Sequence, residues 1–158
     1  MPPTEEFLSM LLGAGFAVLT GYRAPGARTP MASVVIGPPG VFVVHDVALT
    51  GHVVVRRGVL LHDGEPRAFA QHAHRQAVAL QLLLGDAMNE LRLKVNPLLL
   101  VRGVRLGWIR MTSGVRVATD RDLAKVLRRS RSVLSPNQVE RLVELAEHRL
   151  QPIDGLAV

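Results

Sequence analysis

The stretch Ser33-Val-Val-Ile-Gly-Pro-Pro-Gly-Val-Phe-Val-Val44 decides the fold of this 158-residue chain. Residues 33–36 are strand-like, and the Gly-Pro-Pro-Gly that follows forces a tight turn, since glycine and proline favour turn conformations. Residues 41–44 resume as a nearly continuous apolar run, which is typical of a strand covered on both faces. The stretch therefore predicts two strands joined by a tight turn, the second of them inside the protein.

Further strand-like segments, separated by turn residues, lie on both sides of this stretch. A loop rich in proline and glycine covers residues 23–30, and Arg57-Gly58 lies between two apolar runs as in a tight hairpin. The remaining segments predicted as strands are 16–20, 52–56, 59–62, 97–101, 108–111 and 115–118.

Helical periodicity appears in four places. Residues 4–12 read as a short amphipathic helix that ends at Gly13 and Gly15. The longest pattern opens at Pro66, and Gly85 is the point where it is expected to be interrupted or kinked. Its apolar stripe, at spacings of three and four, is Phe69, Ala73, Ala77, Leu80, Leu84, Ala87 and Leu91.

Two helices are predicted to close the chain, each with its own start signal. Thr119 with Asp122 three residues later is predicted to form a capping box. Ser135 is predicted to cap the last helix, with Pro136 at the first helical position and Gln138 at the third.

These elements predict an α/β protein of one domain, residues 1–158, with a central mixed β-sheet flanked by helices. Its length suffices for one core, and the absence of cysteine excludes both disulfides and cysteine metal sites. No apolar run reaches the roughly 18–20 residues that span a membrane. Glu5 and Glu6 lie where a signal peptide needs bases. We therefore expect a cytoplasmic protein with no membrane partner.

Positive charge is concentrated in residues 94–134. The whole chain has a net charge of +6, whereas this segment alone holds ten Lys and Arg against two Asp, a net +8. Of the basic residues in the chain, 17 are Arg, which binds phosphate in a bidentate manner. The segment is interpreted either as a nucleic-acid-binding face or as ordinary solvated charge. The candidate nucleic-acid-binding residues are Arg102, Arg105, Arg110, Arg116, Arg128, Arg129 and Arg131.

Six histidines raise the question of a metal site. His72 and His74 are two apart on a predicted helix, so they point to different faces and cannot chelate together. His45, His52 and His62 lie on or beside predicted strands and could converge, but solvated histidine at a strand end is the commoner outcome. The chain has no nucleophile elbow, no phosphate-binding glycine loop with lysine and no His-Glu-x-x-His pattern.

A metal-dependent nuclease needs two carboxylates to hold a divalent cation against the scissile phosphate. Asp46 follows the strand at 41–44, Asp63 follows the hairpin, and Glu5 and Glu6 lie on the first helix. A strand-end aspartate with a helical glutamate could bind Mg²⁺. The favoured interpretation is a solvated acid and a charge at a helix N-terminus.

The order of elements and residues 32–47 resemble the nuclease-related domain family, a branch of the restriction-endonuclease-like superfamily. Members typically read I-D-H-V-V-V-G-P-x-G-V-F-V-I-(D/E)-T-K, and Val34-Val-Ile-Gly-Pro-Pro-Gly-Val-Phe-Val-Val44 is similar to the middle of that motif. Glu5 or Glu6 is similar to the family's first-helix glutamate, and Gln71 or Gln76 to its helical glutamine. The resemblance covers about residues 5–150 and implies a restriction-endonuclease-like fold.

This sequence departs from the family at the catalytic positions. Ala32 stands where the metal-binding aspartate is expected, His45 replaces the second acid, and Val47 replaces the lysine. Loss of both carboxylates is expected to abolish Mg²⁺ affinity, and no residue substitutes for the lysine that would orient water. The resemblance therefore implies a catalytically degenerate domain without catalytic residues, metal or cofactor.

Three functions follow from these observations. The first is a degenerate nuclease-like domain that binds nucleic acid, with DNA favoured, through residues 94–134. The second is a structural or homo-oligomeric interaction module, in which Arg128, Arg129 and Arg131 only complement a helix dipole. The third is an atypical nuclease that uses Mg²⁺ with His45, Asp46 and a first-helix glutamate.

Overall fold

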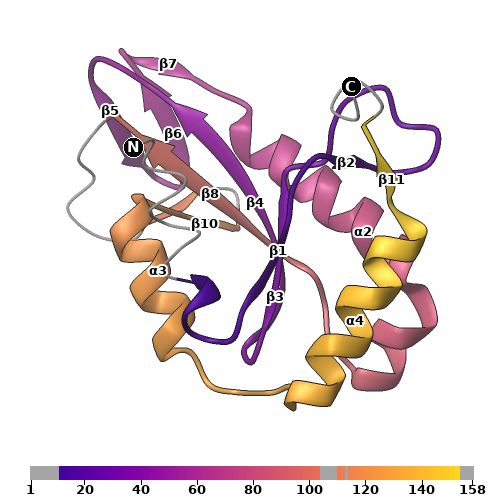
Figure 1. Cartoon of the computed structure of the whole chain (residues 1–158). Helices are drawn as coiled ribbons and strands as arrows, with labels where there is room; N and C mark the ends of the chain where they lie inside the picture. Colours follow the sequence, from indigo (N-terminus) through magenta and orange to yellow (C-terminus); the bar gives the residue numbers. More distant parts are fainter. Residues whose placement is uncertain (1–10, 104–109, 113, 154–158) are drawn as a thin grey trace.

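A six-stranded mixed sheet forms the centre of the protein (Figure 1). The computed structural model describes residues 11–103, 110–112 and 114–153, with only the backbone described at 110–112, 120 and 121. Along the sheet the strands are β1 (Ala17–Leu19), β3 (Ser33–Gly37), β4 (Gly40–Ala48), β8 (Asn96–Arg102), β10 (Val115–Ala118) and β9 (Arg110–Thr112).

The sheet combines antiparallel and parallel pairs of strands. β1, β3 and β4 form an antiparallel meander. β8 is parallel to β4, β10 is parallel to β8, and β9 returns antiparallel at the edge. The predicted α/β class, single domain and central mixed sheet are thereby confirmed.

The hairpin at residues 33–44 has the predicted form. Ser33 pairs with Val44 and Gly37 with Gly40, so the two prolines make the turn. Val34, Val35, Val41 and Val43 have no exposed surface, as predicted for strands covered on both faces. A Cβ at Gly37 would collide with the ring of Phe16, which is why this strand ends in glycine.

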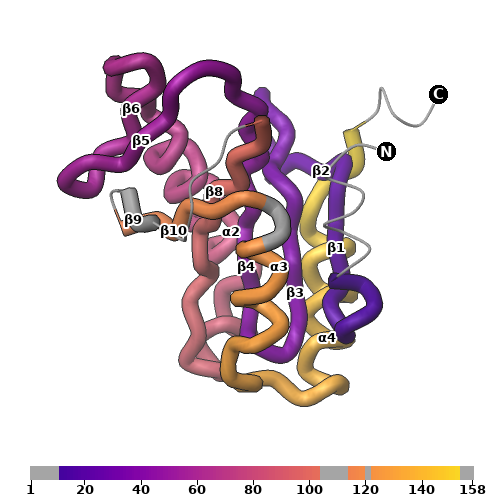
Figure 2. Tube along the Cα trace, turned by 90° about the vertical axis from the view of Figure 1, so that its left-hand side faces the viewer, coloured from indigo at the N-terminus to yellow at the C-terminus, as the bar shows by residue number. Residues whose placement is uncertain are grey.

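Helices cover both faces of the sheet, as Figure 2 shows. Helices α2 (Phe69–Leu91) and α4 (Pro136–Arg149) pack on one face, where Val41 and Val43 share a core with Leu80 and Leu84. Helix α3 (Asp120–Arg129) packs on the other face, with Phe42 and Val44 in its core. Alternate residues of β4 therefore belong to opposite layers.

Two small sheets adjoin the central one. β5 (Val53–Arg56), β6 (Val59–His62) and β7 (Glu65–Pro66) extend beyond β4, and β2 (Tyr22–Arg23) pairs with β11 (Gln151–Pro152). The predicted tight hairpin at Arg57-Gly58 is confirmed, since both residues have positive φ, 51° and 76°, as a type I′ turn requires.

Several local predictions are corrected by the structure. Pro66 belongs to β7, so α2 begins only at Phe69. Gly85 does break α2, with φ 39° and ψ −109°. Beyond this break Met88 becomes the buried residue, while Ala87 and Leu91 of the predicted stripe are only partly buried.

The two predicted capping boxes have different outcomes. Ser135 forms one, because its Oγ accepts from the backbone of Gln138 at 3.2 Å and its own N–H donates to Gln138 Oε1 at 2.8 Å. Thr119 does not, because its hydroxyl donates instead to Asp122 Oδ2 at 3.3 Å. Residues 4–10 and 108–109, within a predicted helix and a predicted strand, lie outside the described residues. In the described chain, no helix is both long and apolar enough to cross a membrane.

Candidate functional site

The three positions that correspond to the catalytic residues of the resembled motif lie at one end of the β3–β4 hairpin. Ser33 pairs with Val44, so Ala32 and His45, the next residue on each strand, adjoin where the strands begin to separate. Val47 is two residues beyond His45 and therefore on the same face of β4, where it packs in one cluster with Phe69 of α2. We call Ala32, His45 and Val47, with the side of α2 that faces them, the strand-end centre.

Gln76 joins α2 to this centre. Its Oε1 accepts the backbone N–H of Ala32 at 2.7 Å, and its Nε2 donates to the carbonyl of Pro30 at 3.4 Å. Of the two glutamines that the resemblance singled out, Gln76 is thus in contact with the centre, whereas Gln71 is exposed to solvent. The amide binds the backbone of the strand as it enters the sheet.

A pair of histidines occupies the same centre. The ring centroids of His45 and His72 are 6.2 Å apart, and the His45 ring is 6.4 Å from that of Phe69. Burial, and then the positive charge of a protonated His72, lower the pKa of His45, although Asp46 opposes this shift. His45 is therefore neutral at pH 7, and its imidazole does not replace the negative charge of a carboxylate.

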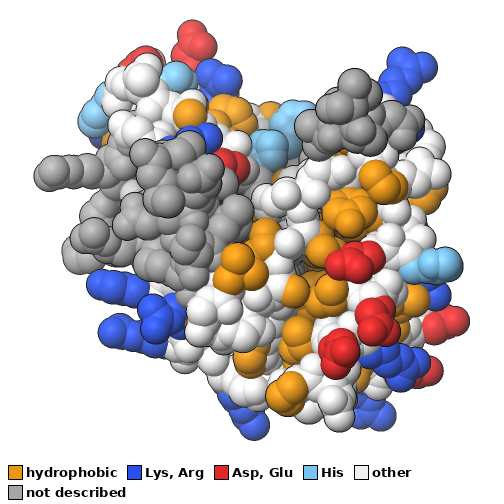
Figure 3. All heavy atoms as spheres, viewed as in Figure 1, with side chains coloured by type: hydrophobic (Ala, Val, Ile, Leu, Met, Phe, Trp, Pro, Cys, Tyr) orange, Lys and Arg blue, Asp and Glu red, His pale blue; other side chains and the backbone are white. Residues whose placement is uncertain are grey.

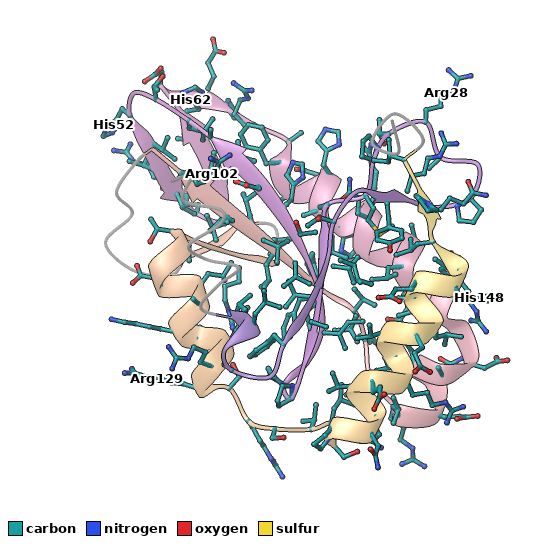
Figure 4. All side chains as sticks on the ribbon, in the orientation of Figure 1. Arg28, His52, His62, Arg102, Arg129 and His148 are labelled. Atoms are coloured by element: carbon teal, nitrogen blue, oxygen red, sulfur yellow. The ribbon has the colours of Figure 1, made fainter. Side chains whose placement is uncertain are left out.

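The alternative in which His45 converges with His52 and His62 on a metal does not hold for the described residues. His52 immediately precedes β5 and His62 ends β6, both in the outer part of the protein that Figure 4 shows. His62 Nε2 lies 2.6 Å from the carbonyl oxygen of Thr50. The partner of His45 is His72, which lies one helical turn before Gln76. The described residues contain no group of three or more His, Asp or Glu that could hold a metal ion.

The aspartates proposed as metal ligands are engaged elsewhere. Asp46 lies on the opposite face of β4 from His45 and accepts from Arg102 Nε at 2.6 Å. The Asp63 side chain accepts the backbone N–H of His52 at 2.8 Å. Glu5 and Glu6 lie outside the described residues.

The seven arginines predicted as a nucleic-acid-binding face do not form one surface. Arg102 lies at the upper end of the sheet and Arg129 at the lower end of α3 (Figure 4). Arg102 is also compensated by Asp46. Arg105 lies outside the described residues, and only the backbone of Arg110, in β9, is described.

The remaining predicted arginines gather at the other end of β4. Arg128 and Arg129 are exposed on the last turn of α3, and Arg131 is exposed in the loop that follows. Lys125, which was not among the predicted site residues, is also exposed and precedes Arg128 and Arg129 by three and four positions, so it shares their side of the helix. That spacing was the signal that could have identified it. We call Lys125, Arg128, Arg129 and Arg131 the basic ridge.

The surface around the basic ridge differs in charge from the surface over α4. Lys and Arg side chains gather near α3 at the lower left of Figure 3, while acidic side chains gather over α4 at the right. Helix α4 carries the acidic residues Glu140, Glu144 and Glu147 in addition to its basic residues. Within the described part of the chain, no ion pair involves a residue of the basic ridge.

A cavity of about 250 Å³ adjoins the basic ridge. Arg116 of β10 and Arg131 line it together, so the structure unites two residues that are 15 positions apart. Phe42 and Leu98 line it as well and are almost completely buried. The loop that carries Arg131 is held in place, because the N–H groups of Val133 and Leu134 donate to the carbonyl of Pro38 at 2.7 and 3.0 Å.

Comparison with models of protein families, with curated proteins and with solved structures finds no significant match to this chain.

Proposed function

We propose that the protein is a catalytically degenerate, restriction-endonuclease-like module that binds nucleic acid, with DNA favoured, through the basic ridge. One observation carries the binding proposal: four exposed cations lie together without an acidic partner among the described residues. Solvated cations in such a group attract the phosphates of a nucleic acid and release its counterions. The proposed face is narrower than residues 94–134 because Arg102 is neutralised by Asp46.

The fold part of the proposal is supported by the order of the strands. An antiparallel meander, β1-β3-β4, is followed by the α2 crossover to the parallel strand β8. The register of β3 and β4 makes positions 32 and 45 neighbours, as the two acids of the resembled motif must be to share a metal.

The catalytic part rests on chemistry at the same positions. Ala32 and Val47 have no ligand atom, and the pKa of His45 is lowered so that its ring is neutral. Mg²⁺ prefers oxygen ligands, carboxylates above all. We therefore propose that this centre supports no hydrolysis. When supercoiled plasmid is incubated with Mg²⁺ or Mn²⁺, wild type and Asp46→Ala should both leave it intact. Nicking by wild type that Asp46→Ala abolishes would favour the atypical nuclease instead.

Binding is tested with a duplex DNA by fluorescence anisotropy over a range of salt concentrations. If the ridge neutralises four phosphates, the plot of log affinity against log salt has a slope of roughly −3.6. Arg128→Glu combined with Arg129→Glu is expected to weaken binding about 100-fold at low salt.

The matched control is Arg28→Glu with Arg141→Glu, which makes the same change of charge at exposed positions on other elements, the loop after β2 and helix α4. It should reduce affinity by a few-fold at most, since it alters only the net charge. Equal losses in the two double variants, or no binding of DNA or RNA at low salt, would contradict the proposal.

A second candidate function, a homo-oligomeric interaction module, is favoured by a different surface. Val78 and Leu82 lie one turn apart on α2 and are 46% and 76% exposed. Exposed apolar pairs of this kind often mark interfaces. Light scattering measures the mass directly: a dimer that Leu82→Glu converts to a monomer would support this function, and a monomeric wild type would exclude it.

A further inference from the structure

The cavity beside the basic ridge has a composition suited to an anionic end group. It is bounded by the Pro38-Pro39 turn, the first residues of β8 and β10, and the residues that follow α3. Phe42 and Leu98, 7% and 2% exposed, supply apolar surface, while Asn96 and Ser130 supply polar groups at its edge. Among the residues that the structure describes, no Asp or Glu lines it.

Two guanidinium groups therefore share a partly apolar cavity to which no described residue contributes a carboxylate. Arg116 is half-buried in β10, where its strand neighbour in the register is Leu98. Like charges that share a cavity repel, and a bound dianion would remove that repulsion while accepting bidentate hydrogen bonds from both groups. The cavity thus favours an anion with more than one charge.

The backbone of Arg131, in the loop after α3, is held in place in the free protein. Ser130 donates to the carbonyl of Val126 at 2.5 Å, and Val133 donates to the carbonyl of Pro38 at 2.7 Å. Arg131 lies between these two attachments, so its backbone loses little freedom on binding. Such preorganisation lowers the entropic cost of ordering a binding residue.

The size of the cavity and the charge of its two arginines favour a terminal phosphomonoester over the phosphodiesters of a duplex backbone. About 250 Å³ can hold a phosphoryl group with part of one nucleoside, but not the continuous backbone of a duplex. A terminal phosphomonoester carries about −1.5 to −2 charges at pH 7, and has one more free oxygen than a phosphodiester. Arg128 and Arg129 lie just before the cavity in the chain, where they can contact the diesters that follow the end.

We propose that this cavity binds the terminal phosphomonoester of a nucleic-acid strand, with Arg116 and Arg131 donating to its oxygens. This inference rests on the proposed function, since the basic ridge supplies the remaining contacts to the strand. The protein would accordingly distinguish a phosphorylated strand end from an unphosphorylated one.

The test compares one duplex oligonucleotide with 5′-phosphate, 3′-phosphate or hydroxyl ends, labelled internally and followed by fluorescence anisotropy. We expect wild type to bind one phosphorylated form about tenfold more tightly than the hydroxyl form. Arg131→Gln and Arg116→Gln should bring this ratio close to one. The Arg131 variant is informative even if Arg116→Gln, in a strand, fails to fold.

Arg129→Gln is the matched control, because it removes one ridge cation outside the cavity lining. It should weaken binding of all three duplexes alike and leave the ratio unchanged. If wild type binds the three duplexes equally, the cavity inference is overturned while the proposed function stands. If wild type binds none of them, both are overturned. Thymidine 5′-monophosphate that binds as tightly as the phosphorylated duplex would assign the cavity to a free nucleotide, and would also overturn the inference.

Discussion

At its first residues, β4 borders a cavity that two arginines line, whereas toward its last residues it passes through the strand-end centre, where His45 is neutral at pH 7. Phe42 points toward the α3 layer and His45 toward the α2 layer, because alternate residues of β4 point to opposite faces of the sheet. A metal-dependent nuclease needs cations that bind phosphate and also carboxylates that hold the metal. Two arginines line the cavity at the first end, whereas the strand-end centre holds no carboxylate among the described residues, so the two ends of one strand offer different chemistry.

Restoring charge to the strand-end centre should have the largest effect. Ala32→Asp with His45→Asp places two carboxylates where the strands separate, and we expect Mn²⁺ binding to appear where wild type has none. Calorimetric titration with MnCl₂ measures it, alongside the rise in melting temperature. The control, Ala68→Asp with His148→Asp, adds the same acids at exposed, separate positions. Equal heats from both variants would show that positions 32 and 45 do not share a metal.

Both ends of β4 depend on the hairpin that carries them. Gly37→Ala is expected to lower the free energy of unfolding by about 2–3 kcal/mol, because its methyl group would collide with the Phe16 ring. Gly26→Ala, at a residue with φ +80° and open space around it, should cost only about 1 kcal/mol. Urea unfolding measures both. A loss at Gly37 no larger than that at Gly26 would mean that Phe16 can move aside.

The ion pair at the upper end of the sheet separates Arg102 from the basic ridge. Asp46→Asn should cost about 1 kcal/mol of stability, since Arg102 would lose its carboxylate in a partly buried setting. In a double-mutant cycle with Arg102→Gln, the double variant should lose about 1 kcal/mol less stability than the sum of the losses of the two single variants. Arg102→Gln should leave DNA affinity nearly unchanged, and a loss as large as that from ridge variants would return Arg102 to the binding face.

The smallest expected effect is the change of folding stability with pH that His45 causes. Burial, then the charge of His72, lower the pKa of His45 from its ordinary value of 6.5, so the folded state resists protonation. Above pH 6.5 both states hold a neutral ring and the full stability is present. As pH falls below 6.5, the unfolded chain takes up its proton first and stability decreases.

His45→Gln should therefore flatten the decline of stability between pH 6.5 and 5, followed by urea unfolding at each pH. His148→Gln, at an exposed residue of α4, provides the comparison and should leave the decline unchanged. If His45→Gln leaves the decline unchanged as well, His45 does not cause it.

Local patterns predicted much of the fold. The hairpin at 33–44, the turn at Arg57-Gly58, the break at Gly85 and the Ser135 capping box are all confirmed, because each depends on residues within a few positions of one another. The predicted Thr119 capping box is wrong although it too depends on nearby residues, because the Thr119 hydroxyl donates to the Asp122 carboxylate instead.

The candidate site was predicted less well because its contacts join distant segments. Arg102 was assigned to the binding face, but the parallel pairing of β4 with β8 brings it to Asp46, 56 residues away. His72 was dismissed as a ligand partner of His74 and not considered with His45, since only the packing of α2 on β4 makes these two adjacent. Periodicity identifies the side of a helix but not the strand that it will cover.

The sequence by itself determined the two strands at 33–44, the order of the elements and an excess of positive charge, since hydrophobic pattern, turn residues and composition are properties of the chain alone. Only the tertiary structure decided which charges act together. It paired Arg102 with Asp46, placed Arg131 beside Arg116, and brought Ala32, His45 and Gln76 to one centre. The physical reason is that electrostatic and hydrogen-bonding energies depend on distance in space, which the register of the strands sets and which separation along the chain does not reveal.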